Sequence, residues 1–145
     1  MVLLGRSEMN AEAAHFMRRL SPCIDCATVV TLSGELGAGK TAFVKGVARA
    51  LGITEQVTSP TFVIMKIYGL EGQKFDRLVH IDAYRLKGER HLKMLGWGDL
   101  LKNPKNLILI EWPEQAGSAI PVSAITIHFR YSGDDEREIV YEGER

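Results

Sequence analysis

The feature that most constrains this chain is a glycine-rich segment, residues 34–41, in which Gly34 is followed by Gly39, Lys40 and Thr41. This spacing matches the pattern Gly-x-x-x-x-Gly-Lys-Ser/Thr, a loop whose backbone N–H groups turn inward on an anion. The lysine of such a loop contacts the outer phosphates of a nucleotide, and the threonine hydroxyl contacts magnesium. We therefore predict a nucleoside triphosphate site whose remaining loop residues are Glu35, Leu36, Gly37 and Ala38.

The segments on either side of the loop support this interpretation. Residues 27–32 are an apolar, β-branched run typical of a buried strand. Apolar residues then recur with helical spacing from residue 42 to residue 51, and Gly52 is placed to end the helix. Strand, loop and helix therefore occur in the order that a phosphate-binding loop requires, which an incidental glycine turn does not explain.

Length and charge narrow the class of protein. With 145 residues, of which 46% are hydrophobic, the chain is expected to form one globular domain over residues 1–145. Eighteen basic residues balance 18 acidic ones, so no overall field draws the protein to nucleic acid or to an anionic membrane. Contact with RNA would then need a local patch or a partner protein.

The chain start lacks the long apolar core of a signal peptide, and no segment approaches the roughly 20 apolar residues of a membrane span. We therefore expect a cytoplasmic protein. Cys23 and Cys26 form a single Cys-x-x-Cys pair, which could serve redox chemistry or half of a metal site. Because no second pair follows and the four histidines lack ligand spacing, we interpret both as reduced thiols; the histidines are His15, His80, His91 and His128.

Two acidic residues directly follow predicted strands. Asp82 ends the apolar run 78–81, and Glu111 ends the run 107–110, whose uniform hydrophobicity is typical of the middle of a parallel sheet. Ligands bind at the carboxyl ends of such strands, so each acid is a candidate to hold magnesium or its bound water. Spacing alone does not choose between them, and Asp82 could instead be a turn or cap residue.

Three further segments have two interpretations each. Residues 57–62, with three hydroxyls and Pro60, form either a switch that senses the terminal phosphate or a Ser-Pro turn before a strand that reaches Tyr68. Arg85 either neutralises phosphate charge or anchors an ion pair. Trp112 follows Glu111 at the same sheet edge, where its indole borders the nucleotide or packs in the core.

The remaining elements complete the predicted fold. Ser7 is predicted to cap an amphipathic helix that ends before Pro22, and a short helix over residues 89–95 is stopped by Gly96. The strand ending at Tyr68 is expected to pair as a hairpin with residues 78–81, and residues 125–141 are predicted to form a second, antiparallel hairpin. We expect a three-layer α/β P-loop NTPase domain with a small mixed β-sheet and this C-terminal hairpin.

Four motifs together make the sequence resemble the bacterial TsaE (YjeE) family of small P-loop ATPases. They are the loop at 34–41, Thr-Ser-Pro-Thr-Phe at 58–62, His-Ile-Asp-Ala-Tyr-Arg-Leu at 80–86, and Ile-Glu-Trp-Pro-Glu at 110–114. Their order and spacing extend along almost the whole chain and are far more specific than the loop alone. Ala83 and His91 depart from the residues usual in the family, and both lie outside the phosphate machinery.

The resemblance implies a function and assigns the site. Such proteins bind ATP with Mg²⁺ and hydrolyse it in support of the TsaD and TsaB proteins, which form threonylcarbamoyladenosine (t6A) at adenosine 37 of transfer RNA. Lys40 would then act on the phosphates, Thr41 and Glu111 would hold the metal, and Asp82 would orient water or the metal shell. Ser59 and Thr61 would be switch residues near the terminal phosphate, and Trp112 would adjoin the nucleotide.

A rival function is a small-molecule or nucleoside kinase built on the same loop. The residues after the loop helix show neither an arginine-rich lid nor an acceptor site, which disfavours it. The strand-end acids argue against a third function, a nucleotide-binding regulator without hydrolysis. The sequence contains no confident arginine finger, so we expect weak hydrolysis by the protein alone, stimulation when a partner orders residues 58–61, and contact with tRNA only through that partner.

Overall fold

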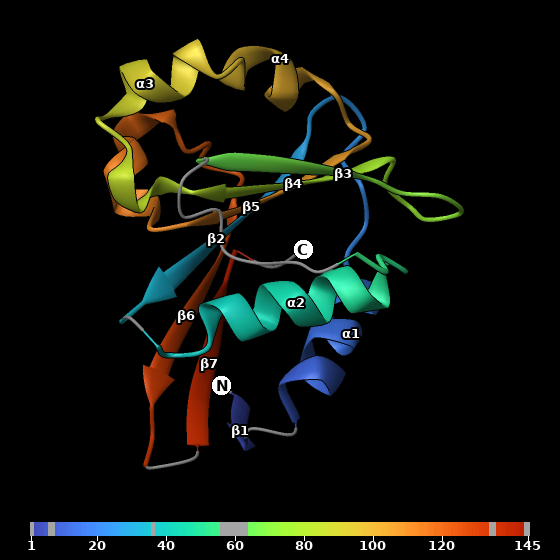
Figure 1. Cartoon of the computed structure of the whole chain (residues 1–145), viewed down its shortest axis with the longest axis vertical. Helices are drawn as coiled ribbons and strands as arrows, with labels where there is room; N and C mark the ends of the chain where they lie inside the picture. The colour runs from blue at the N-terminus through green and yellow to red at the C-terminus, as the bar shows by residue number, and fades with distance from the viewer. Residues whose placement is uncertain (1, 6–7, 36, 56–63, 134–135, 144–145) are drawn as a thin grey trace.

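The computed structural model describes residues 2–5, 8–35, 37–55, 64–133 and 136–143. Its centre is a seven-stranded mixed sheet in the order β1-β7-β6-β2-β5-β4-β3 (Figure 1). The strands are β1 Val2–Gly5, β2 Thr28–Gly34, β3 Met65–Gly69, β4 Arg77–Asp82, β5 Asn106–Glu111, β6 Ile125–Tyr131 and β7 Glu136–Glu142.

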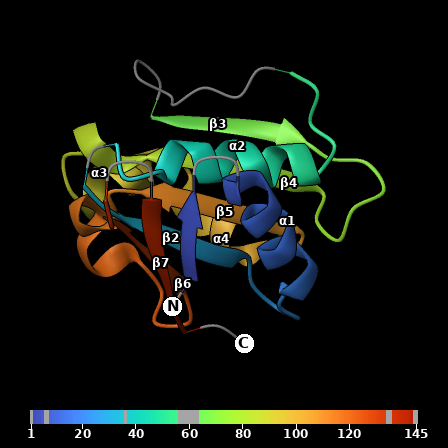
Figure 2. The same ribbon diagram turned by 90° about the horizontal axis from the view of Figure 1, so that it is seen from below.

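Helices cover both faces of this sheet, which gives the predicted three layers. One face carries α1 (Met9–Arg19) and α2 (Lys40–Ala50), which lie side by side in both views (Figures 1 and 2). The other face carries α3 (Glu89–Met94), α4 (Trp97–Lys102) and the 3₁₀ segment η3 (Pro113–Ala119). A shorter 3₁₀ turn, η2 (Ala83–Arg85), follows β4. The longest of these described helices have 11 residues, too few to cross a bilayer.

Parallel pairing at the centre brings three strand ends to one edge. β5 pairs in parallel with both β2 and β4, and every residue of β5 is buried, as predicted for the middle strand. The register places Leu32 and Asp82 opposite Glu111. The ends of β2, β4 and β5 therefore meet where the phosphate-binding loop begins.

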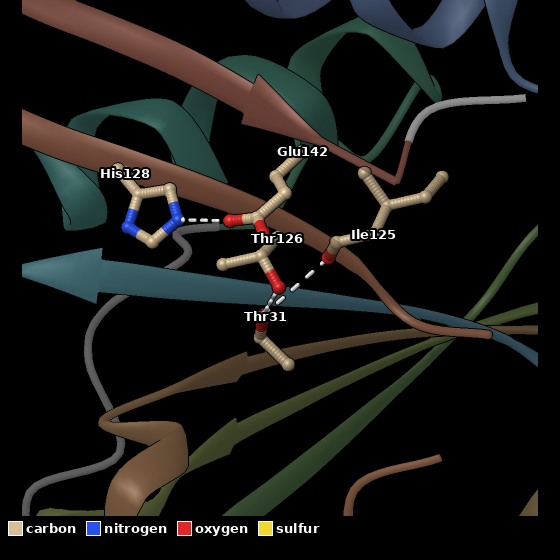
Figure 3. Close-up of polar contacts among 5 residues, drawn as sticks. All are labelled: Thr31, Ile125, Thr126, His128 and Glu142. Atoms are coloured by element: carbon tan, nitrogen blue, oxygen red, sulfur yellow. Dashed lines mark hydrogen bonds and ion pairs between the residues drawn. The ribbon is translucent and has the colours of Figure 1, made fainter. Parts of the chain in front are cut away.

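The C-terminal hairpin of β6 and β7 is confirmed and joins the sheet beside β2. β6 runs parallel to β2 and antiparallel to β7. Thr31 Oγ1 of β2 donates to Thr126 Oγ1 of β6 at 2.9 Å, and His128 Nε2 lies 2.8 Å from Glu142 Oε2 of β7 (Figure 3). These contacts link three adjacent strands. The predicted hairpin of β3 with β4 is also present.

Alternation along the strands divides the interior into two cores. Val30, Leu78 and Leu109 point toward α1 and α2, and their sequence neighbours Val29, Val79 and Ile108 point toward α3 and α4. Uninterrupted apolar runs are thus explained by burial on both faces.

Some elements differ from the sequence prediction. β1 pairs with β7 and was not predicted, because four residues are too few to show an alternating pattern. Gly96 ends α3 as expected, but α4 begins at the next residue. Ser7 lies outside the described residues, and the residue at the start of α1 is Glu8, whose side chain makes no capping hydrogen bond to the helix.

α1 and α2 approach closely because small residues face each other. A β-carbon added to Gly46 of α2 would lie 2.7 Å from the β-carbon of Ala13 of α1. The rings of Phe16 and Phe43 pack beside this contact with centroids 5.7 Å apart. The β-carbon of Ala13 and the backbone of α1 cannot move aside by a side-chain rotation, so the close spacing of the two helices depends on Gly46.

We predict that Gly46→Ala destabilises the protein. Overpacking costs about 1–3 kcal/mol, which exceeds the roughly 1 kcal/mol gained when alanine replaces glycine inside a helix. Urea denaturation measures the change. Gly98→Ala in α4 is the matched control, because nothing lies within 4 Å of its added β-carbon and the substitution should stabilise. Equal stabilisation by both variants would contradict the packing argument.

Candidate active site

The phosphate-binding loop connects β2 to α2, as the sequence predicts. Gly34 is the last residue of β2, and Gly39 precedes α2 as its N-cap. Gly37 and Gly39 have φ angles of 80° and 108°, which side chains with a β-carbon rarely adopt. The first N–H groups of α2 have no partner within the helix, so they are donors for an anion at its positive end.

A cleft of about 260 Å³ lies in front of this loop. It brings together predicted site residues from three separate segments, and its lining residues are Gly37, Gly39, Lys40, Thr41, Ala42, Asp82, Glu111 and Trp112. Of the other predicted loop residues, Ala38 is buried and Glu35 is exposed. Leu36, Ser59 and Thr61 lie outside the described residues.

The two strand-end acids are neighbours in the sheet. Asp82 and Glu111 are paired residues at the ends of β4 and β5. Glu111 is buried, whereas Asp82 is half-buried and accepts a hydrogen bond from the backbone N–H of Tyr84 at 3.1 Å. Asp82 therefore lines the cleft and also caps η2, which confirms the cap interpretation, while its role toward magnesium or water stays a prediction.

A buried histidine holds Glu111. His80 Nε2 lies 2.7 Å from Glu111 Oε2, and both side chains are almost completely buried. His80 is opposite Leu109 in the register, so its side chain is on the same face as Glu111, two residues further along β5. A carboxylate only accepts hydrogen bonds, so Nε2 donates.

Sequence reasoning missed this contact and treated His80 as one of four scattered histidines. The available signal was a polar residue inside an apolar strand, two positions before Asp82. Within the described part of the chain, His80 Nδ1 has no hydrogen-bond partner.

Lys40 is held between the loop and an aromatic ring. Its Nζ donates to the backbone oxygen of Gly34 and lies 3.7 Å from the centroid of the Trp112 ring. Burial lowers the pKa of Lys40, and the nearby carboxylates of Glu111, Glu114 and Asp82 oppose that effect. The ammonium group is thus poorly hydrated and adjacent to acids, a setting in which a phosphate is a strong additional partner.

Trp112 has an unusual backbone. Its φ angle is 58°, the left-handed region, and it is the only residue other than glycine with positive φ among those described. It follows β5 directly, and Pro113 begins η3 at the next position. The indole contacts Lys40 on one side and the Tyr84 ring at a centroid distance of 5.2 Å. Backbone strain of this kind is concentrated at functional sites.

The oxygen donors in the cleft fit magnesium. Thr41 offers a hydroxyl, and Asp82 and Glu111 offer carboxylates. Mg²⁺ prefers oxygen ligands and is usually bound by one or two carboxylates together with substrate phosphates and water. The hydrogen bond from His80 engages Oε2 of Glu111 and leaves Oε1 as an acceptor.

The other candidates lie away from this cleft. Arg85 is exposed on η2, and among the described residues no ion pair holds it. Cys23 and Cys26 precede β2 and are partly buried. Within the described ranges, no group of three or more His, Cys, Asp or Glu side chains could hold a metal ion.

Comparison with known proteins identifies the family. The profile of "Threonylcarbamoyl adenosine biosynthesis protein TsaE" matches residues 7–139. The chain belongs to the TsaE family. A relative from Bacillus subtilis named tRNA threonylcarbamoyladenosine biosynthesis protein TsaE is 42% identical over 113 residues, 78% of this chain and 68% of the relative. The relative of the same name from Treponema pallidum is 40% identical over 112 residues, 77% of this chain and 79% of that one.

The fold agrees with this assignment to TsaE. The crystal structure of YdiB from Bacillus subtilis matches with a TM-score of 0.73 and 31% sequence identity, covering 97% of this chain and 82% of that chain. The predicted P-loop architecture, and the resemblance from which the family was inferred, are thereby confirmed.

The contact between His80 and Glu111 predicts non-additive stability changes. His80→Leu should lower the free energy of unfolding by about 1–3 kcal/mol, because a buried carboxylate loses its donor. Adding Glu111→Met should cost less than the sum of the two single variants, since the double variant leaves no polar group unsatisfied. A double-mutant cycle by urea denaturation tests this, and strictly additive changes would contradict the coupling.

The contact between Lys40 and Trp112 predicts a fluorescence signal in this TsaE protein. ATP with magnesium should change Trp112 emission, because the Lys40 charge is drawn from the ring toward the phosphates. Trp97 is the control: it is buried, does not line the cleft, and donates from its Nε1 to the Ala119 oxygen at 3.1 Å. The change should survive Trp97→Phe and disappear in Trp112→Phe. The reverse pattern would refute the proposed geometry.

Proposed function

We propose that this protein is a magnesium-dependent ATPase that supports formation of t6A at adenosine 37 of tRNA by TsaD and TsaB, without performing the transfer itself. The observation that carries the proposal is the cleft in which the phosphate loop and two strand-end acids meet, in a chain of the TsaE family. Its relatives from Bacillus subtilis and Treponema pallidum are named as tRNA threonylcarbamoyladenosine biosynthesis proteins.

Binding of the triphosphate would use the start of α2. The N–H groups at Gly39, Lys40 and Thr41 offer hydrogen bonds to the phosphates, and the helix dipole adds positive potential at the same point. Lys40 is the only cationic side chain that lines the cleft among the described residues. Its move from the Trp112 ring to a phosphate would replace a cation–π contact with a charge-assisted hydrogen bond.

Hydrolysis would use the acids at the sheet edge. Thr41 and Glu111 would hold magnesium, which when bound withdraws charge from the phosphate oxygens. His80 fixes the carboxylate of Glu111, so the orientation of that side chain is set before the nucleotide arrives. Asp82, half-buried beside it, would orient the attacking water or the metal shell.

The charged residues that line the cleft argue for a partner protein. The described cleft lining contains a single cation, whereas fast P-loop hydrolases add an arginine to neutralise charge in the transition state. Basic and acidic residues are equal in number, so strong direct attraction to tRNA is not expected. A TsaD and TsaB complex would therefore complete the site and carry the tRNA. The kinase alternative has no support, since the relatives reported above carry the TsaE name.

We predict slow phosphate release by the protein alone and stimulation by a TsaD–TsaB complex, with little effect of tRNA alone. Partners that complete a P-loop site commonly raise the rate by about 10³–10⁵-fold. Steady-state phosphate release under the three conditions tests this. Fast turnover by the isolated protein, or activation by free tRNA but not by the complex, would refute the mechanism.

Two variants separate nucleotide binding from hydrolysis. Lys40→Ala should weaken ATP binding measured by calorimetry, because a charge-assisted hydrogen bond is worth about 1.5–3 kcal/mol. Glu111→Gln keeps an acceptor for His80 but loses the charge, so it should retain nucleotide binding and impair hydrolysis. Unchanged ATP affinity in Lys40→Ala would remove the basis for the phosphate site.

A further inference from the structure

A tyrosine from the C-terminal hairpin contacts the phosphate loop. Tyr131, the last residue of β6, donates from Oη to the backbone oxygen of Gly37 at 2.7 Å, across 94 positions of the chain. Gly37 also lines the cleft. Although it makes this contact, Tyr131 is 46% exposed, so much of its surface remains open beside the loop.

An arginine from the adjacent strand covers part of this ring. The guanidinium carbon of Arg137 in β7 lies 4.3 Å from the centroid of the Tyr131 ring. The stem of Arg137 passes close to the loop, since its Cγ would be 3.7 Å from a β-carbon built on Gly39. Arg137 thus stacks on Tyr131 and limits how the ring can turn.

The position of this pair in the sheet indicates its role. β2, which leads into the loop, has β5 on one side and β6 on the other. The acids Asp82 and Glu111 are on the β5 side, so the metal and the outer phosphates belong there. With magnesium joining these acids to the outer phosphates, the nucleoside end of the chain would lie on the other side of the loop, toward β6.

The hairpin that carries the pair is firmly attached to β2. Thr31 is 2% exposed and donates to Thr126, and Glu142 pairs with His128 one strand further out (Figure 3). These contacts fix the register of β2, β6 and β7. Tyr131 is therefore presented to the loop by a rigid element rather than by a mobile side chain on a long loop.

We propose that Tyr131, positioned by Arg137, forms the wall against which the nucleoside half of the nucleotide packs, while the phosphates occupy the loop. This inference rests on the proposed function and adds the element that distinguishes a nucleoside triphosphate from triphosphate alone. The ring supplies a flat apolar surface for a base or ribose, and its hydroxyl holds Gly37 so that the loop keeps its shape.

The test compares ATP with inorganic tripolyphosphate, each with magnesium, by calorimetry. Tripolyphosphate fills the loop but has no nucleoside. Tyr131→Ala should weaken ATP binding by about 10-fold or more relative to tripolyphosphate, the scale of a lost stacking contact. Arg137→Ala should lower the ratio of ATP affinity to tripolyphosphate affinity less strongly than Tyr131→Ala does, because the Tyr131 ring remains but is no longer held in place.

Two control variants distinguish packing against the Tyr131 ring from two other effects: the loss of the hydroxyl bond to the loop, and the loss of a nearby positive charge. Tyr131→Phe keeps the ring and loses only the bond to Gly37, so any weakening should be equal for both ligands. Arg130→Ala removes a neighbouring arginine whose side chain is 71% exposed and lies 4.0 Å from Glu138, and it should leave both affinities unchanged.

The outcomes are distinguishable. An unchanged ratio in Tyr131→Ala, with wild-type protein binding both ligands, would overturn the nucleoside wall and leave the proposed ATPase intact. Wild-type protein that binds neither ligand would overturn the proposed function, and the wall with it.

Discussion

The parallel pairing of β5 with its two neighbours is the constraint on which the site depends. Parallel strands end at the same edge, so β2 delivers the phosphate loop to the place where β4 and β5 deliver their acids. None of these groups is close to the others in sequence, and a one-residue slip in register would move Glu111 to the other face of the sheet. The contact between His80 and Glu111 opposes that slip, because a shifted register would leave this buried carboxylate without its donor.

Electrostatic groups at this edge depend on one another. A carboxylate as buried as Glu111 needs a donor, and His80 supplies it from the neighbouring strand. Lys40 balances the acids from the opposite side, although burial disfavours its charged form. Lys40 and Glu111 are thus held almost out of solvent in the protein itself, an arrangement that limits how far these groups must reorganise when a charge nearby changes.

The sequence predicted structure correctly wherever the signal lies within one short segment of the chain. The loop motif, the uniform hydrophobicity of β5 and the alternation of the C-terminal hairpin each contain their own evidence, and all three were predicted correctly. Motif order also identified the family. β1 was missed because four residues carry too little pattern, and its pairing with β7 depends on a strand more than 130 positions away.

Contacts between distant segments were the other limit of prediction. Whether His80 meets Glu111 is decided by the register of β4 with β5, which spacing along the chain does not contain. The bond from Tyr131 to Gly37 likewise requires β6 to lie beside β2. Asp82 and Glu111 were found as candidates because both follow apolar runs, yet their pairing became evident only in the sheet.

The left-handed backbone of Trp112 has a consequence for how this site can change. Glycine would relieve the backbone strain at this position, but it would also lose the packing of the ring against Tyr84. Glycine would also remove the ring beneath the Lys40 ammonium group and leave that charge against the carboxylates alone. A relaxed backbone and the ring contact with Lys40 therefore exclude each other at this single residue, and the tryptophan keeps the ring contact.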